Sequence, residues 1–354
     1  MINTEGLLPF LASDCGIQSA VVMATSGSTG ESKFAVLSKR ALLHSAGAVI
    51  RHCELEKADV WLSSLSDFHV GGLGIYARAY VAGGKVEELL PGKWDRSGRR
   101  LVEACQASGA SLTSMTPTHL HDLVVGSVKA PLGLRGVFLG GGRIDLALVE
   151  RAIELGWPIW PSYGMTEACS QIATSTDGES EWLPVLEEWE CQISPEGRLA
   201  IRGDALFSGY ASKQSGEWRF QPALDEDGWF ETGDRCELND GRLRFLDRAD
   251  DVVKISGELI SLSRVNDIAE RAAVEFGAEA QVVAVPDARR ENSLVMIGSV
   301  LQGRATLLLD QVNAELDSIE KVDRVLVVEE LPRTEIGKLD RAKLLQLAMG
   351  QACD

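Results

Sequence analysis

The sequence predicts an α/β protein with a large N-terminal domain, a β-rich subdomain and a small C-terminal α+β domain. The 354 residues exceed one domain of about 150 residues. Short apolar runs alternate with helical patterns in the first two thirds, which indicates a partly parallel sheet. From about Trp189, short strands are separated by Asp, Asn and Gly turns, which favours an antiparallel or barrel-like unit. We therefore expect domains at 1–249 and 250–354, with the boundary near Asp247–Asp251.

The individual elements follow from apolar runs and helical spacing. In the N-terminal part, we expect strands at 20–24, 59–65, 111–115, 136–139 and 158–160, helices at 101–107 and 146–155, and then strands at 197–202 and 242–245. Beyond the boundary, we expect a helix at 263–275, a strand at 281–285, a helix at 305–316 and a strand at 324–328.

Composition narrows the class of protein. With 45% hydrophobic and 25% charged residues, the chain has an ordinary globular composition and is not expected to be disordered or fibrous. The formal net charge of -17 would repel the phosphates of nucleic acid and an anionic membrane surface. Nucleic acid is therefore disfavoured as a partner. An anionic ligand would need a local cluster of cations and backbone N–H groups.

Cysteine usage and hydropathy indicate the compartment. The seven cysteines contain no C-x-x-C pair, which disfavours structural zinc and a disulfide framework. We find neither a signal peptide nor an apolar stretch of about 18 residues, so we expect no membrane insertion. These observations predict a reduced, soluble, cytoplasmic protein. The sequence leaves open whether it forms a homodimer.

The run TSGSTGESK, Thr25 to Lys33, directly follows the apolar run AVVMA. A strand that opens into Gly, Ser and Thr offers backbone N–H groups and hydroxyls to phosphate oxygens, and Lys33 adds a charge. The alternative is a flexible surface turn. The run is not a Walker A motif, because Lys33 lies three residues past Gly30 and precedes Phe34. The candidate phosphate-binding residues are Thr25, Ser26, Gly27, Ser28, Thr29, Gly30 and Lys33.

Three further segments carry candidate chemistry. In YGMTE, Tyr163 could stack on a nucleobase and Glu167 could hold Mg²⁺. Asp234 could accept hydrogen bonds from a ribose diol and Arg248 could donate to it, although a turn aspartate and a surface arginine are the alternatives. Lys338 follows Gly337 in LPRTEIGKLDR, where an isolated lysine would otherwise be solvated surface.

Together and in this order, TSGSTGESK, FHVGG, GGG, YGMTE, TGD, DRADDVVKISGE and PRTEIGK resemble the signature set of the adenylate-forming acyl-CoA synthetase superfamily. The resemblance covers Thr25 to Leu344. It implies two domains joined by a hinge at Asp250, with ATP bound between them. It also implies Mg²⁺ as the metal and coenzyme A (CoA) as co-substrate. Superfamily members usually have more sequence before the phosphate loop, so a reduced N-terminal subdomain is expected.

The resemblance implies a role for each matching residue. Lys338 would bridge the carboxylate and the phosphate during adenylation, Lys33 would act with it, Thr166 would contact the α-phosphate and Glu167 would hold Mg²⁺. Lys254 and Gly257 would belong to the loop that serves thioester formation. The other nucleotide-binding positions would be Gly140, Gly141, Gly142, Tyr163, Gly164, Met165, Asp234 and Arg248.

Two segments are also similar to the 2-succinylbenzoate–CoA ligases of menaquinone synthesis: FHVGGLGIYAR, which ends in Arg78, and YGMTEACSQ. An arginine suits the second carboxylate of such a dicarboxylic acid, which a strongly acidic protein would otherwise repel. The alternatives are that Arg78 lies on a helix surface and that His69 is a packed core histidine. The candidate acid-binding residues are His69, Gly71, Gly72, Arg78, Ser170 and Gln171, with Gly74 beside them in the expected pocket floor.

Three other functions stay open at this point. The acid could be another aryl or aliphatic carboxylate. The acyl group could pass to a carrier-protein thiol instead of CoA. A non-enzymatic nucleotide-binding protein is the third alternative, but it would be expected to lack Lys338 or Glu167, and both are present.

Overall fold

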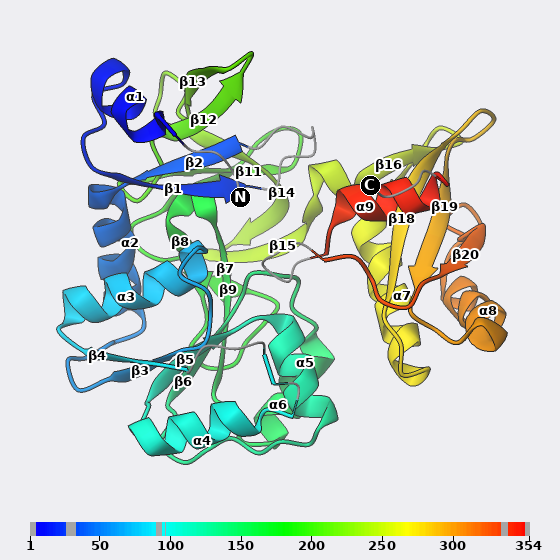
Figure 1. Cartoon of the computed structure of the whole chain (residues 1–354), viewed down its shortest axis with the longest axis horizontal. Helices are drawn as coiled ribbons and strands as arrows, with labels where there is room; N and C mark the ends of the chain where they lie inside the picture. Colours follow the sequence, from blue (N-terminus) through cyan, green and yellow to red (C-terminus); the bar gives the residue numbers. More distant parts are fainter. Residues whose placement is uncertain (1–4, 26–32, 90–93, 96, 334–338, 351–354) are drawn as a thin grey trace. The chain divides into compact units, whose positions relative to one another are not determined.

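The structure is a computed structural model that describes residues 5–25, 33–89, 94–95, 97–333 and 339–350 (Figure 1). Its contacts divide the chain into two units. One unit comprises Met1–Thr232 and Cys236–Phe245, and the other comprises Gly233–Arg235 and Leu246–Asp354. Each unit is described by itself below. The domains 1–249 and 250–354 stay our proposal for the functional division.

A six-stranded sheet forms the centre of the first unit, in the order β4-β3-β5-β6-β7-β8. The first five strands are parallel, and β8 runs antiparallel to β7. The predicted α/β class is thereby confirmed. The bounds are β3 Val60–Ser63, β4 Lys85–Glu88, β5 Leu112–Met115, β6 Gly136–Leu139, β7 Ile159–Met165 and β8 Ser170–Thr174.

Helices cover both faces of this sheet (Figure 1). Because side chains of a strand point alternately to opposite faces, Trp61 packs in the cluster with α2 and α3, whereas the next residue, Leu62, packs in the cluster with α4, α5 and α6. The sheet is therefore packed between two apolar layers. The helices are α2 Lys39–His52, α3 Val70–Ala82, α4 Arg99–Ser108, α5 Pro117–Val125 and α6 Leu146–Glu154.

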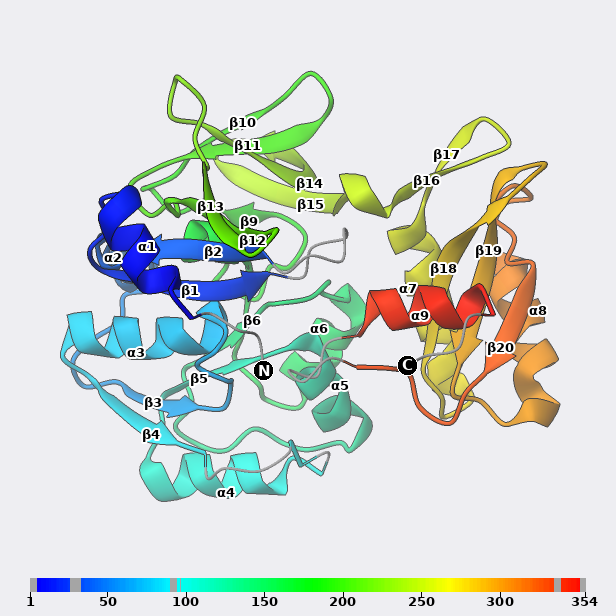
Figure 2. The same cartoon turned by 45° about the horizontal axis from the view of Figure 1, so that its top comes forward.

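Two antiparallel sheets complete the first unit (Figure 2). The expected buried strand at 20–24 is β1, but it pairs antiparallel with β2 outside the parallel sheet, and Val21 is 36% exposed. One sheet has the order β1-β2-β12-β13 and the other the order β10-β11-β14-β15-β9. The bounds are α1 Leu7–Asp14, β1 Ala20–Thr25, β2 Lys33–Ser38, β9 Leu183–Pro184, β10 Glu190–Ile193, β11 Arg198–Arg202, β12 Gly209–Gln214, β13 Glu217–Pro222, β14 Phe230–Asn239 and β15 Arg242–Arg248.

The second unit is built on a three-stranded sheet, β18-β19-β20, with α7 and α8 packed on one face and α9 on the other. A separate hairpin, β16–β17, precedes α7. Within the part of the chain that the structure describes, no helix is long and apolar enough to cross a membrane. The bounds are β16 Val252–Ile255, β17 Glu258–Ser261, α7 Leu262–Glu275, β18 Ala280–Asp287, β19 Glu291–Gly298, α8 Ala305–Glu315, β20 Arg324–Val327 and α9 Arg341–Ala348.

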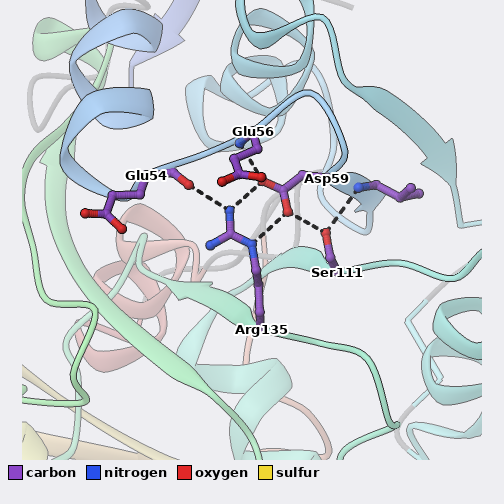
Figure 3. A network of polar contacts seen from close by, with 6 residues as sticks. Glu54, Glu56, Asp59, Ser111 and Arg135 are labelled. Atoms are coloured by element: carbon purple, nitrogen blue, oxygen red, sulfur yellow. Dashed lines mark hydrogen bonds and ion pairs between the residues drawn. The ribbon is translucent and has the colours of Figure 1, made fainter.

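Buried polar contacts tie together the amino ends of β3, β5 and β6 (Figure 3). Arg135 Nε donates to Asp59 Oδ1 over 2.7 Å, and Ser111 Oγ donates to the same oxygen over 2.8 Å. The backbone N–H of Glu56 donates to Asp59 Oδ2 over 2.8 Å. Burial alone would raise the pKa of Asp59, but the hydrogen bonds from Arg135, Glu56 and Ser111 outweigh it and lower that pKa.

Replacing Asp59 with asparagine should destabilise the fold at neutral pH by about 1–3 kcal/mol, because Arg135 loses its charged acceptor. The pKa of Asp59 is lower in the folded protein. The contribution of Asp59 to folding stability is therefore complete above the pKa that Asp59 has in the unfolded chain. It is lost as the pH falls through the lower pKa that Asp59 has in the folded protein. Urea unfolding at pH 7 and at pH 3 should show a smaller difference between wild type and Asp59→Asn at the lower pH. An equal difference at both would contradict this account.

Candidate active site

The carboxyl ends of β6 and β7 bring the predicted adenine-binding segments together. Gly140, Gly141 and Gly142 directly follow β6, and Tyr163 lies near the carboxyl end of β7. Neighbouring parallel strands end at the same sheet edge, and Ser162 Oγ donates across them to the carbonyl of Leu139 over 2.9 Å. The segments are adjacent in the fold although more than 20 residues separate them. Whether adenine binds there stays a prediction.

At Gly164, the backbones of β7 and β8 approach each other closely. The register of the two strands shifts between Tyr163 and Gly164. A Cβ atom at Gly164 would lie 1.9 Å from the carbonyl oxygen of Ser170, so only glycine allows this approach. The close approach holds the YGMTE segment against β8. It thereby fixes where Thr166 and Glu167 begin the next turn.

Glu167 lies in a 3₁₀ turn, Thr166–Ala168, directly after β7. Tyr210 Oη donates to Glu167 Oε1 over 2.6 Å. The ammonium of Lys33 lies 6.0 Å from the centre of the same tyrosine ring, because β2 and β12 are neighbouring strands. Glu167 and Lys33, both predicted to be catalytic, therefore lie beside Tyr210. Sequence analysis did not identify Tyr210. The pairing of β2 with β12 joins distant segments, and no local pattern reveals it.

The donor set around Glu167 fits a hard cation such as Mg²⁺. A carboxylate oxygen is a preferred ligand, and the phenol of Tyr210 orients it. Among the described residues there is no group of three or more His, Cys, Asp and Glu side chains that could hold a metal by itself. Such an ion would therefore need oxygens from a phosphate ligand and water besides Glu167, which is the usual situation for Mg²⁺.

Removing the hydroxyl of Tyr210 should impair turnover without unfolding the protein. In Tyr210→Phe, Glu167 loses its orienting donor, while the ring stays packed against Phe207 at a centroid distance of 4.7 Å. We expect the Mg²⁺ concentration for half-maximal pyrophosphate release to rise on the order of tenfold. Tyr80→Phe is the control, because Tyr80 is 76% exposed on α3. If Tyr210→Phe and wild type depend equally on the Mg²⁺ concentration, Tyr210 does not orient Glu167 for metal binding.

Arg78 is buried on α3 and meets both polar residues predicted to act with it. It is 2% exposed, and its Nη1 donates to Ser170 Oγ over 3.4 Å and to Gln171 Oε1 over 3.3 Å. The alternative of a helix-surface arginine is therefore wrong. The guanidinium carbon lies 5.0 Å from the ring centre of Trp61 and 5.2 Å from that of Phe138. These two aromatic residues pack against Arg78 in the candidate site, and the sequence did not indicate them.

The charge of Arg78 is incompletely compensated. Burial lowers its pKa to about 10, so it stays protonated at neutral pH. Its Nε atom is buried without a hydrogen-bond partner among the described residues, and no ion pair within the described residues includes it. An isolated buried cation is costly. The arrangement is chemically suited to receive an anion.

Glycines at the start of α3 bring its backbone close to the preceding loop. His69 is the residue before the helix, and its N–H donates to the carbonyl of Ser66 over 3.2 Å. A Cβ at Gly72 would lie 2.1 Å from that same carbonyl, and one at Gly74 would lie 3.2 Å from Arg78 Nη1. Gly71 is less crowded, with Leu65 Cδ1 3.6 Å from a Cβ position. A role of these residues in binding an acid stays a prediction.

The predicted ribose pair lies together on β14 and β15, in the parts of these strands that the contacts assign to the second unit, with Arg248 Nε 3.3 Å from Asp234 Oδ1. Asp250, the predicted hinge residue, belongs to a 3₁₀ turn, Ala249–Asp251. The structure describes the backbone but not the side chain of Asp250, and the same holds for Thr25. The predicted residues Ser26, Gly27, Ser28, Thr29, Gly30 and Lys338 lie outside the described residues. Lys254 and Gly257 lie on the β16–β17 hairpin and are considered below.

Curated relatives share most of the chain. A 2-succinylbenzoate–CoA ligase of Bacillus cereus is 29% identical over 353 residues, which cover 93% of this chain and 70% of the relative. A protein of the same name from Listeria innocua is 29% identical over 335 residues, covering 92% and 70%.

Solved structures with the same fold include o-succinylbenzoate CoA synthetase (MenE) from Bacillus subtilis in complex with the acyl-adenylate intermediate OSB-AMP. Its TM-score is 0.77, its identity is 25%, and the match covers 91% of this chain and 68% of that one. The same enzyme in complex with ATP and magnesium ion gives a TM-score of 0.76 at 26% identity, covering 91% and 69%.

Family models match both parts of the sequence. The model of the AMP-binding enzyme C-terminal domain matches residues 271–338. The model described as AMP-binding enzyme matches residues 16–211, more than half of the chain. Because it covers more than half of the chain, this match shows that the chain belongs to the AMP-binding enzyme family.

Proposed function

We propose that this protein is an ATP-dependent acid–CoA ligase that converts 2-succinylbenzoate into its CoA thioester through an acyl-adenylate. The curated relatives carry the name of this activity, and a structural neighbour binds the corresponding adenylate. The described cysteines are all free thiols, which fits an enzyme of the reducing cytoplasm. A homodimer is compatible with this function, and sedimentation of the purified protein would determine the oligomeric state.

Arg78 is the observation that favours a dicarboxylic acid. Activation of one carboxyl leaves the second as an anion, which a protein of net charge -17 repels at long range. A buried guanidinium beside Ser170 and Gln171 could form charge-assisted hydrogen bonds to that anion. A monocarboxylic acid has no group that would compensate this charge. The geometry therefore supports a dicarboxylate above the other acids that the family uses.

In the first half-reaction, the acid's carboxylate oxygen attacks the α-phosphorus of ATP, and pyrophosphate leaves with the electron pair of the broken P–O bond. Both reactants are anionic, so the enzyme must position them and neutralise charge. Lys338 and Lys33 would supply positive charge, and the hydroxyl of Thr166 would contact the α-phosphate. Mg²⁺ held at Glu167 would neutralise phosphate charge, and Tyr210 keeps that carboxylate oriented.

In the second half-reaction, the thiolate of CoA attacks the carbonyl carbon of the adenylate, and AMP leaves with its oxygen. This step needs no enzyme nucleophile, which agrees with scattered cysteines whose described members are mostly buried. Burial raises the pKa of Cys53 and of Cys169 to about 12, so neither is a thiolate at neutral pH. The loop with Lys254 and Gly257 would serve this step.

The test is to mix purified protein with MgATP, CoA and 2-succinylbenzoate and to detect the product by mass spectrometry. The proposal expects a succinylbenzoyl thioester and AMP, with benzoate inert under the same conditions. Thioester formation from benzoate alone would support a different acid. Adenylation without a soluble thioester would instead indicate transfer to a carrier-protein thiol. The absence of pyrophosphate release with every acid tested would refute the ligase.

A further inference from the structure

The turn between β16 and β17 is held by a carboxylate from another hairpin. Glu291, at the start of β19, accepts a hydrogen bond from the backbone N–H of Gly257 at its Oε2 over 2.8 Å. Its Oε1 lies 3.2 Å from Lys254 Nζ. One side chain thus contacts both residues of this loop that the family resemblance associates with thioester formation. All three residues belong to the second unit.

The surrounding backbone supports the same contact. The N–H of Ser256 donates to the carbonyl of Arg290 over 2.8 Å, and Asn292 Nδ2 donates to the carbonyl of Lys254 over 2.9 Å. Residues on both sides of Glu291 therefore bind the same turn. The β18–β19 turn acts as a support against which the β16–β17 turn rests.

Glu291 occupies a backbone conformation that does not favour glutamate. Its φ is 69°, in the left-handed region where glycine is the usual residue at the end of such a turn. A residue with a Cβ atom is disfavoured there and is retained where its surroundings compensate. Within the described residues, the carboxylate of Glu291 contacts Gly257 and Lys254. These contacts lower the pKa of Glu291, and the hydrogen bond from Gly257 is the larger cause.

These contacts are too exposed to be explained by stability. The side chain of Lys254 is 55% exposed and that of Glu291 is 45% exposed. Exposed ion pairs of this kind contribute little to folding. A strained backbone and a weakly stabilising ion pair together point to a requirement for the geometry of the turn. The ammonium of Lys254 also has three donors, so it can contact an anionic ligand while one donor faces Glu291.

We propose that Glu291 is a positioning residue: it holds the turn with Lys254 and Gly257 in the conformation that the thioester-forming half-reaction requires. The inference rests on the proposed ligase function and adds a residue outside the family's signature segments. Adenylation, which the resemblance assigns to other residues, does not depend on this turn. Loss of the carboxylate should therefore separate the two half-reactions.

The main variant is Glu291→Gly, which removes the carboxylate and also relieves the left-handed strain, so the fold should be preserved. Glu291→Gln keeps an acceptor for Gly257 but loses the charge that faces Lys254. The matched control is Glu258→Gln, which removes one negative charge from an exposed residue next to Gly257. Melting temperatures establish that all three variants fold.

Three measurements are made on the full chain. The rate of thioester formation is measured from preformed acyl-adenylate and CoA, and adenylation is measured by acid-dependent ATP–pyrophosphate exchange. The hydrogen exchange of the Gly257 amide reports the contact itself. We expect Glu291→Gly to lower the thioester rate on the order of tenfold, to leave adenylation unchanged and to speed the exchange of Gly257. Glu291→Gln should be intermediate, and Glu258→Gln should match wild type.

A normal thioester rate in Glu291→Gly would overturn the inference, as would an equal loss in Glu258→Gln or a parallel loss in both half-reactions. These outcomes leave the ligase function standing, because wild type would still form the thioester. If wild type forms no adenylate from any acid, the proposed function fails and the inference fails with it. The two failures are therefore distinguished by the wild-type reaction.

Discussion

Arg78→Met should lose activity on 2-succinylbenzoate without losing stability. The wild-type guanidinium is 2% exposed and lacks a carboxylate partner among the described residues, and burial lowers its pKa to about 10. A buried charge without an ionised partner carries a desolvation cost that an apolar side chain of similar length does not. Charge-assisted hydrogen bonds contribute about 1.5–3 kcal/mol each. We therefore expect kcat/KM for the dicarboxylate to fall on the order of 10²-fold or more, with an unchanged or higher melting temperature.

Two comparisons make this result specific. Arg78→Lys keeps the charge but loses the planar fork, so its activity should lie between those of wild type and Arg78→Met. Any residual adenylation of a monocarboxylic acid should be spared in Arg78→Met. If the melting temperature falls by many degrees while activity per folded molecule is retained, Arg78 is a structural residue that contacts Trp61, Phe138, Ser170 and Gln171 for stability alone.

Lys338→Ala should slow adenylation strongly while sparing the later step. The resemblance assigns this lysine to the carboxylate and the phosphate, where charge develops when pyrophosphate leaves. Loss of one such electrostatic contact costs on the order of 10²–10³ in rate. Thioester formation from preformed acyl-adenylate should continue, because the lysine is not required after the phosphate bond has been made. Single-turnover assays of the two steps would measure both effects.

Lys343→Ala is the control for Lys338. Lys343 lies on α9 with its ammonium 3.8 Å from Asp340, and its side chain is 49% exposed. The Lys343→Ala substitution removes one positive charge, as Lys338→Ala does, from the same region of the sequence. Equal losses in the two variants would show that only the local net charge matters. Loss of both half-reactions in Lys338→Ala would contradict a role limited to adenylation.

Local patterns predicted the parallel strands β3, β5, β6 and β7, because these strands are largely buried and their runs are visible in the sequence. The parallel edge strand β4 was missed, because its residues Lys85–Glu88 are mostly charged and exposed. β6 lies at Gly136–Leu139 as expected, and α6 ends one residue before the predicted end. β7 continues to Met165, beyond the expected strand at 158–160, because β8 returns antiparallel and pairs with the extra residues. That extension depends on pairing with a segment whose polar residues gave no strand signal.

The candidate site was assembled from motif residues, and the neighbouring residues that sequence analysis missed share one property. Tyr210, Trp61 and Phe138 reach the site by packing across sheets or between helix and sheet. Their identity as site residues depends on which strands are neighbours, and sequence spacing carries no such information. The partial compensation of Arg78 was equally inaccessible, because burial and neighbouring charges are properties of the folded chain.

The pairing of β2 with β12 has a consequence for synthesis on the ribosome. These strands join residues 33–38 to residues 209–214, so β2 lacks one neighbour until most of the first unit has emerged. Until then its backbone edge and its apolar residues, which include Phe34 and Val36, would be available to other chains. A nascent chain stalled before residue 209 should therefore depend on chaperones, and truncation there should yield aggregates rather than a smaller folded protein.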